Sequence, residues 1–279
     1  MIDIKQIISK SEKYNFHSHT QFCDGRDVME NILLSAIGHG FTDWGFSPHS
    51  PVPLESPCNM SDADLKPYFS EIDRLRDKYG DRINIYRSIE IDYLGDWGPS
   101  NAYFQYMDLD YRIGSVHFIP SFAGDGYVDI DGSFENFKPK MAEHFYNDIE
   151  GVVLSFYTQT LDMIEKGGFD IIGHFDKIGY NASMYRPGID KQDWYKSLVR
   201  ETFEAIMDHG YWIEINTKAY DKSGIFFPHQ QFWHLLKKYD APVVFNSDAH
   251  FPELVNAGRV EAMTMFKELK NIVGTERME

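Results

Sequence analysis

Short apolar stretches alternate with longer amphipathic stretches along most of this 279-residue chain. In the longer stretches apolar residues recur at helical spacing, and glycine follows two of them where a helix would end. The predicted helices cover residues 28–39, 62–79, 151–166, 191–209, 232–239 and 257–269. The first predicted strand ends at residues 15–16. The other predicted strands cover 43–47, 83–91, 113–118, 169–174, 211–215 and 242–246.

The order of these segments indicates an α/β domain of roughly seven strand–helix units, either a parallel barrel or a doubly wound sheet. No linker rich in Pro, Gly or Ser divides the chain, so we expect a single domain over residues 1–279. Residues 94–150 are less regular and rich in aromatic residues. We interpret the second half of this segment, around 120–150, as an insertion that covers an active site.

In both architectures, functional residues gather where the parallel strands end. Histidines and carboxylates follow the apolar runs of this chain at those points, with one asparagine: His17, His19, Asp24, His49, Glu90, Asp92, His117, His174, Asp176, Asn216, Asp248 and His250. Residues two apart in a strand point to the same side, so His17 and His19 can hold one metal, as can Asp248 and His250. Imidazole and carboxylate together suit Zn, Fe(II) and Mn(II). The pattern therefore predicts a multinuclear metal site.

Several of these residues also have an ordinary structural interpretation. His17 and His19 could simply end an exposed strand, and His49 could be a turn residue near its prolines. Asp24 precedes Gly25 in a good turn dipeptide. Glu90 would be costly to bury alone, which either a metal or an ion pair with Arg87 would explain.

Other histidines and one cysteine have structural interpretations too. His117 and His174 could be buried histidines bonded to a backbone carbonyl. Five further histidines fall in helical or loop segments and are expected to be structural: His39, His144, His209, His229 and His234. Cys23 lies beside the predicted site, and we expect it to be an inert thiol.

The composition indicates which binding partners and which cellular compartment to expect. The net charge of −16, from 27 basic and 43 acidic residues, disfavours nucleic acid and anionic membranes as partners. No apolar run approaches the roughly 18 residues that span a bilayer, and the N-terminus lacks the pattern of a signal peptide. With only two cysteines, we expect a cytoplasmic protein without disulfides.

Six segments together resemble one known family. They are His17-Ser-His19-Thr, His49 after a strand, Glu90-Ile-Asp92-Tyr, Ser115-Val-His117, Gly173-His174 and Ser247-Asp248-Ala-His250. In this order they resemble the PHP (polymerase and histidinol phosphatase) family, particularly its histidinol-phosphate phosphatase branch. The similarity extends from about residue 15 to about residue 260. It implies a distorted (β/α)7 barrel of the TIM-like, PHP type with three divalent metal ions (Zn, Mn or Fe).

The resemblance also implies how the ligands divide among the three metals. His17, His19, Glu90 and Asp248 would hold the first. Glu90 would bridge to a second, which His117 and His174 would also hold. The third would be held by Asp24, His49 and His250. Many members of this branch have a histidine near position 24, so Asp24 is a departure that bears on the third metal.

The expected reaction is hydrolysis of L-histidinol phosphate to L-histidinol and phosphate, a step of histidine biosynthesis. Three dications and three carboxylates would leave the site about three charges positive, which suits a phosphate dianion and an attacking hydroxide. Glu90 and Asp248 are the catalytic candidates, as ligands that position this hydroxide. Lys177 and Asn216 are the candidates for substrate contacts.

Two alternatives remain open at this point. One is a phosphoesterase acting on another small ester, such as a sugar phosphate or a nucleotide. The other is a non-catalytic metal-binding regulatory domain. The sequence leaves the oligomeric state open.

Overall fold

The computed structural model describes residues 2–276, and its parallel strands form two sheets. The first sheet has the order β1-β2-β3, with β1 (Tyr14–Asn15), β2 (Asp43–Phe46) and β3 (Asn84–Arg87). The second has the order β10-β9-β8-β5-β4, with β4 (Glu90–Asp92), β5 (Ile113–Ser115), β8 (Ile171–Ile172), β9 (Trp212–Asn216) and β10 (Val243–Asn246).

The two sheets meet first within the segment that was expected to form one strand over residues 83–91. That expectation is wrong in detail, because β3 pairs with β2 whereas β4 pairs with β5. The residues between β3 and β4 still form hydrogen bonds to both sheets. The amide of Ser88 donates to the carbonyl of Phe46, and the amide of Ile113 donates to the carbonyl of Ile89. If β3 and β4 are counted as one interrupted strand, the structure is the expected distorted (β/α)7 barrel.

The second meeting place joins β1 to β10, largely through side chains. The amide of Phe16 donates to Oδ1 of Asn246 (2.8 Å), and the amide of Ser247 donates to Oδ1 of Asn15 (2.7 Å). Buried Arg259 donates to the carbonyls of Phe245 and Tyr14, one on each strand. These bonds satisfy buried backbone groups where no regular ladder forms between the two strands. We call this contact the β1–β10 seam.

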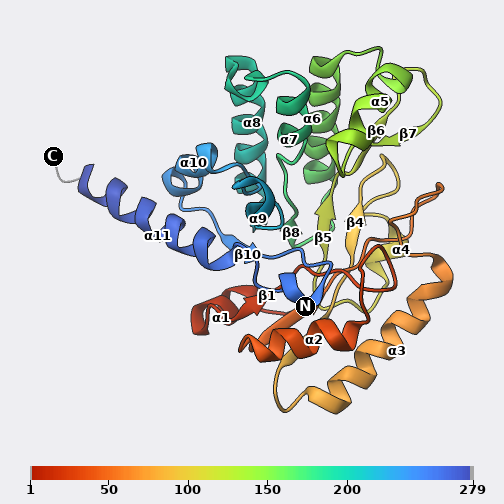
Figure 1. Ribbon diagram of the computed structural model, residues 1–279, viewed down its shortest axis with the longest axis vertical. Helices are drawn as coiled ribbons and strands as arrows, with labels where there is room; N and C mark the ends of the chain where they lie inside the picture. The colour runs from red at the N-terminus through yellow and green to blue at the C-terminus, as the bar shows by residue number, and fades with distance from the viewer. Residues whose placement is uncertain (1, 277–279) are drawn as a thin grey trace.

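Helices surround the strands on opposite sides, with α2 and α3 on one side and α6, α7 and α8 on the other (Figure 1). The α-helices are α1 (Ile4–Lys10), α2 (Met29–Gly38), α3 (Asp62–Tyr79), α4 (Ala102–Gln105), α5 (Phe134–His144), α6 (Ile149–Lys166), α7 (Ile178–Tyr185), α8 (Asp193–His209), α9 (Tyr220–Ser223), α10 (Trp233–Lys238) and α11 (Arg259–Glu276). Short 3-10 turns cover Ile189–Lys191, Gln230–Phe232 and Pro252–Leu254. None of these helices is long and apolar enough to cross a membrane.

Local signals explain where the predicted helices begin and end. The Asp148 side chain accepts a hydrogen bond from the amide of Gly151 and so caps α6. Gly210 ends α8 with a φ of 74°, a conformation that glycine adopts without steric cost. All six helices expected from the sequence are present, with ends that differ mostly by one to three residues. Helix α11 extends further, and α1, α4, α5, α7 and α9 were not predicted.

The segment after β5 differs most from the expectation. The strand expected over 113–118 ends at Ser115, and a hairpin follows, formed by β6 (Phe118–Pro120) and β7 (Tyr127–Asp129). Helix α5 completes this segment, which we call the β6–α5 insertion (residues 118–144). The strand is shorter than its apolar run because β6 pairs with β7 and leaves the barrel sheet.

Candidate metal centre

The nine predicted metal ligands converge at the ends of the parallel strands. His17 and His19 follow β1, His49 follows β2, Glu90 opens β4 and His117 follows β5. The remaining four lie after β8, after β10 and in the loop that follows β1: His174, Asp248, His250 and Asp24. All except Asp24 are buried, and together they form groups whose ligand atoms lie within 4.8 Å of one another.

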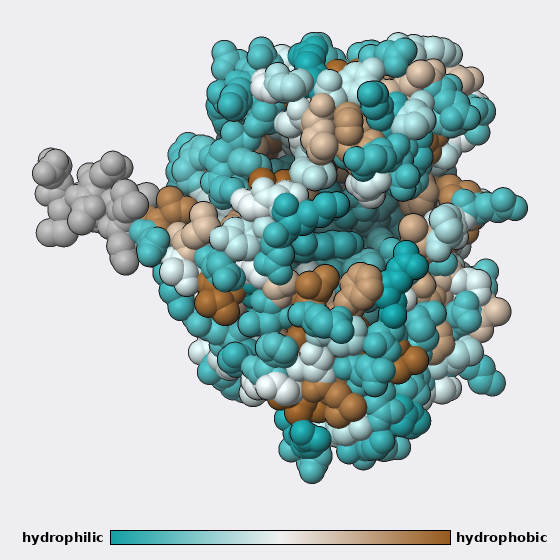
Figure 2. Space-filling view, in the orientation of Figure 1, coloured by the Kyte–Doolittle hydropathy of each residue, from teal (hydrophilic) through white to brown (hydrophobic). Residues whose placement is uncertain are grey.

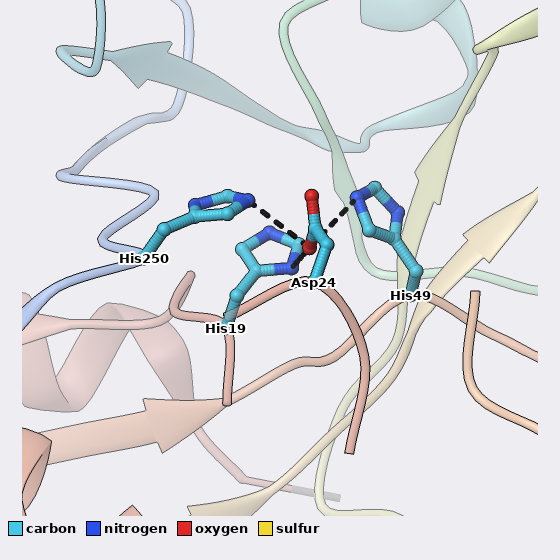
Figure 3. A group of neighbouring side chains, drawn as sticks. All are labelled: His19, Asp24, His49 and His250. Carbon is cyan, nitrogen blue, oxygen red and sulfur yellow. Dashed lines mark ion pairs between the residues drawn. The ribbon is translucent and has the colours of Figure 1, made fainter. Parts of the chain in front are cut away.

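One group consists of His19, Asp24, His49 and His250 (Figure 3). Oδ1 of Asp24 lies 3.2 Å from Nε2 of His250, 3.6 Å from Nδ1 of His19 and 3.8 Å from Nε2 of His49. The three imidazoles therefore surround a single carboxylate oxygen. Asp24 therefore brings a carboxylate oxygen to this group of three histidines.

A second group contains His17, His19 and Asp248. Nε2 of His19 lies 3.2 Å from Nε2 of His17 and 3.0 Å from Oδ1 of Asp248. Asp248 has a φ of 48°, in the left-handed region that few residues other than glycine adopt. Such strain persists where the surrounding structure enforces it, often at functional sites.

A third group contains Glu90, His117 and His174. Oε1 of Glu90 lies 2.9 Å from Nε2 of His174 and 3.5 Å from Nε2 of His117. The other oxygen, Oε2, lies 3.2 Å from Nε2 of His17 and 3.1 Å from Nδ1 of His49. Glu90 therefore contacts members of all three of these groups, and a fourth group, His49, Asp92 and His117, overlaps two of them. Arg87, the alternative partner for Glu90, instead pairs with Asp73 and Asp108.

The side chains fit divalent metal ions by two independent observations. Imidazole nitrogens face each other at 3.2 Å (His17 and His19) and 3.3 Å (His117 and His174). Two nitrogens bound tetrahedrally to one zinc at 2.0–2.1 Å would lie roughly 3.3–3.4 Å apart. In addition, Oδ1 of Asp24, Nδ1 of His49 and Oε2 of Glu90 are buried and lie at ion-pair distances from other side chains of the cluster, but make no hydrogen bond with a described residue. Buried polar atoms of this kind are costly unless a cation satisfies them.

Carboxylates behind the cluster orient two of the histidines. Oε1 of Glu214 lies 2.7 Å from Nδ1 of His17, and Oδ1 of Asp92 lies 2.6 Å from Nδ1 of His117. In both rings Nε2 is thereby left to face the cluster. This arrangement is common among histidines that bind metals, since the carboxylate fixes the tautomer and the ring orientation.

The buried charges shift the pKa values of the cluster in opposite directions. For His17, burial lowers the pKa, but Glu214, Glu90 and Asp248 outweigh burial and hold the pKa well above its usual value. For His19, burial and the neighbouring imidazoles push the pKa well below its usual value, so that ring is neutral. For Glu90, burial raises the pKa, but the surrounding histidines hold it well below its usual value and the carboxylate stays ionised.

The two expected substrate contacts have different surroundings. Nζ of Lys177 donates to Oδ2 of Asp131 (2.7 Å) and so joins the start of α7 to the β6–α5 insertion. The fully buried Asn216 side chain donates to Oε2 of Glu214 (3.1 Å) and to Oδ2 of Asp248 (3.0 Å). These bonds orient two carboxylates of the cluster from behind.

Lys218 is a further cation at the cluster that was missed in the sequence. Its Nζ lies 3.2 Å from Nε2 of His250 and 3.4 Å from Oδ1 of Asp248. About a third of its side chain is exposed, so it stands at the rim. Its position two residues after β9 could have signalled it, because the other site residues also follow strands.

The five histidines that were expected to be structural lie outside the candidate metal groups. His39, His209 and His234 each contact a carbonyl of the same helix or turn through Nδ1. His144 lies on α5, and His229 caps a short turn. Cys23 lies 3.5 Å from Nδ1 of His19, and burial raises its pKa to about 12, so its thiol remains protonated.

A pocket of about 740 Å³ opens over the cluster. Asp24, His49, His117 and Lys218 contribute to its floor and rim, and the β6–α5 insertion supplies much of the remaining wall. The face seen in Figure 2 is hollowed near its centre, where hydrophilic residues predominate. A pocket of this size accommodates a small metabolite.

These features define a class of protein, an α/β barrel with a multinuclear metal centre at its strand ends, and comparison with known proteins identifies the family. The model of the PHP domain matches residues 15–218, and the chain belongs to that family. A relative from Schizosaccharomyces pombe, described as a "Probable histidinol-phosphatase", is 27% identical over 86% of this chain and 81% of its own.

Two solved structures share the fold. The protein hisK from Listeria monocytogenes is 23% identical, with a TM-score of 0.78 over 88% of this chain and 98% of the other. A histidinol phosphate phosphatase from Lactococcus lactis, solved with zinc, L-histidinol and phosphate, is 22% identical, with a TM-score of 0.70 over 92% of this chain and 93% of the other. These likenesses confirm the expected barrel.

Proposed function

We propose that this chain is a histidinol-phosphate phosphatase that hydrolyses L-histidinol phosphate to L-histidinol and phosphate. The observation that carries the proposal is the contact of Glu90 with all three ligand groups, which builds one multinuclear centre beneath a metabolite-sized pocket. The names of the relative from S. pombe and of the zinc-containing protein from L. lactis support the substrate. The reaction would serve histidine biosynthesis in the cytoplasm.

In this proposal three divalent ions (Zn, Mn or Fe) occupy the three groups. His17, His19, Glu90 and Asp248 would hold the first ion, and Glu90, His117 and His174 the second. Asp24, His49 and His250 would hold the third, with His19 close enough to contribute. Divalent ions in this arrangement would polarise the phosphoryl group and activate water for in-line attack.

The protein's own residues hold the charges and orient the ligands. Glu90 remains ionised and bridges the groups, and Glu214 and Asp92 fix the tautomers of His17 and His117. Asp92 and Glu214 add two negative charges to those of Asp24, Glu90 and Asp248. Three dications would then leave the site about one charge positive, which still attracts a phosphate dianion.

Two lysines are our candidates for contacts with the phosphate. Lys218 reaches the cluster through Asp248 and His250 and is partly exposed to the pocket. Lys177 is held by Asp131 close to the cluster, and substrate would compete with that carboxylate for it. We assign Asn216 a positioning role, because its amide donates to Glu214 and Asp248.

We also propose that the β6–α5 insertion covers the bound substrate and selects it. Asp125, Asp129, Asp131 and Glu135 of the insertion line the pocket together with Lys140, which pairs with Asp129, so this part of the wall holds four carboxylates and one lysine. Histidinol carries an ammonium group and an imidazole, so an acidic wall opposite the metal centre suits it better than it suits an anionic sugar phosphate or nucleotide.

The test is phosphate release from L-histidinol phosphate, compared with a panel of sugar phosphates and nucleotides, with the protein loaded with Mn, Zn or Fe. We expect kcat/KM for histidinol phosphate to exceed the others by at least about a hundredfold, which is about 2.7 kcal/mol of discrimination. Uniformly weak activity across the panel would contradict the proposed substrate but not the proposed metal centre. Normal metal content without activity on any ester would instead favour a regulatory domain.

A further inference from the structure

A loop between β2 and α3 forms part of the wall of the pocket over the metal centre. We call residues 51–60 the β2–α3 loop. Residues 54–59 of this loop line the pocket together with residues of the β6–α5 insertion. The loop contains no helix or strand, so side-chain hydrogen bonds have to hold it in place.

The side chain of Asn59 makes three hydrogen bonds, each to a different part of this region. Its Nδ2 donates to the carbonyl of Ser50 (2.7 Å), just before the loop, and its Oδ1 accepts from Oγ of Ser56 (2.6 Å). The same Nδ2 donates to Oδ2 of Asp92 (2.6 Å), which lies 33 residues away on β4. The orientation of this amide is determined by its neighbours, because a carbonyl and a carboxylate both require a donor.

Asp92 connects this contact to the metal centre. It is fully buried, and its Oδ1 lies 2.6 Å from Nδ1 of His117, whose Nε2 faces the cluster. The backbone amide of Asp92 donates to Oγ of Ser50 (3.1 Å), so the same short segment holds both the backbone and the carboxylate. With a partner on each oxygen, the carboxylate cannot rotate away from His117 without losing a hydrogen bond.

Asp92 also belongs to a candidate metal group with His49 and His117, so two roles are open to it. The observed bonds favour the orienting role. Oδ1 is engaged with Nδ1 of His117, and Oδ2 lies 2.6 Å from Nδ2 of Asn59 but 3.9 Å from Nδ1 of His49. The amide of Asn59 therefore stabilises Asp92 as the partner that orients His117.

We propose that Asn59 is a positioning residue, which holds Asp92 against His117 and so couples the β2–α3 loop to the metal centre. The inference rests on the function proposed above, in which His117 is a metal ligand and the loop borders the bound substrate. Coupling between two sites is reciprocal. A loop ordered by Asn59 therefore favours metal binding at His117, and metal binding at His117 favours the ordered loop by the same factor.

Zinc affinity, measured without substrate by competition with a chromophoric chelator, tests this coupling. Asn59→Ala should weaken the binding of at least one zinc ion about tenfold, because His117 loses part of its orienting support. Asn59 is only half-buried, so this variant is expected to fold. Asn31→Ala is the matched control, since this exposed asparagine of α2 also donates to a carboxylate, that of Asp27 (2.8 Å), and lies outside the pocket and the metal groups. Unchanged affinity in Asn59→Ala, or an equal loss in both variants, would overturn the proposal.

Two further variants separate positioning of His117 from a merely structural role in the loop. Ser56→Ala removes the bond to Oδ1 of Asn59 and leaves the bond to Asp92, so we expect a higher KM with unchanged zinc affinity. When Asp92→Ala is already present, adding Asn59→Ala should change zinc affinity less than about twofold, because its partner is gone.

The opposite results would contradict the proposal. A loss of zinc affinity in Ser56→Ala equal to that in Asn59→Ala would show that order in the loop, and not the contact with Asp92, governs metal binding. A full additional loss in the double variant would show the same. If Asp92→Ala does not fold, the other three variants decide. Weak activity on every ester would contradict the proposed function alone, since zinc affinity is measured without substrate.

Discussion

Oε1 of Glu214 lies 2.7 Å from Nδ1 of His17, and both side chains are fully buried. The other oxygen of Glu214 accepts hydrogen bonds from the amide of His174 and from the side chain of Asn216. One carboxylate therefore fixes two histidines that belong to different ligand groups. Its position beneath the cluster allows it to orient ligands of two groups at once.

Glu214→Gln should lower metal content and kcat/KM by about ten- to a hundredfold, because the new amide NH2 cannot accept all the bonds that the carboxylate accepts. Elemental analysis and steady-state kinetics measure the two effects. Glu165→Gln is the matched control, because its side chain is 69% exposed. Full metal content and activity in Glu214→Gln would contradict the orienting role.

Glu90→Gln should reduce kcat/KM at least about a thousandfold, or about 4 kcal/mol, because the ligand groups lose their shared carboxylate. The comparison is His39→Gln, which alters an exposed histidine at the end of α2 and should leave turnover intact. Nearly full activity of Glu90→Gln with normal metal content would disprove the trinuclear arrangement. A collapse of turnover in folded His39→Gln would show that the histidines were divided wrongly.

Removal of the metals with a chelator should lower the thermal unfolding midpoint by at least about 5 °C. Without cations, the buried carboxylates of Glu90 and Asp248 lie among histidines that cannot neutralise them all, and the ligands bridge elements far apart in the chain. Differential scanning calorimetry before and after chelation, and after addition of zinc, measures the change. An unchanged midpoint with metals fully removed would show that the site does not stabilise the barrel.

Lys218→Met should raise KM for the phosphate ester about tenfold, because a cation at the rim of the cluster is lost. Lys222→Met is the control, since this exposed lysine on α9 lies away from the pocket. A larger loss in kcat than in KM would mean that Lys218 acts on the transition state and not on substrate binding. Unchanged kinetics in both variants would leave the phosphate contact to Lys177.

The positions of the predicted ligands other than Glu90 could be read from the sequence because they follow apolar runs, whereas Glu90 was found as a lone carboxylate within a predicted strand. In a parallel barrel this local property determines the global position, since all strands end on the same face. Glu214 was missed because it lies within its strand, between Ile213 and Ile215. The argument applied to Glu90, that a lone carboxylate in a buried strand needs a partner, would have found it.

Other features depend on tertiary structure and have no local signal. The break between β3 and β4 arises because the two halves of one apolar run pair with different neighbours. Helix α7 contains Gly179, Asn181 and Ser183 within eight residues, a composition with weak helix propensity. Its contacts with α6 and with the insertion stabilise it, and a single sequence does not reveal those contacts.

The β1–β10 seam also governs the order in which this protein can fold during its synthesis. Phe16 bonds to Asn246, which the ribosome adds 230 residues later. At roughly 5–20 residues per second, β1 waits roughly 12–46 seconds for its partner. During that time β1 has only β2 beside it, and the strand ends that carry His17 and Asp248 are not yet together. The complete metal centre can therefore form only near the end of translation, as a late event in the life of the nascent chain.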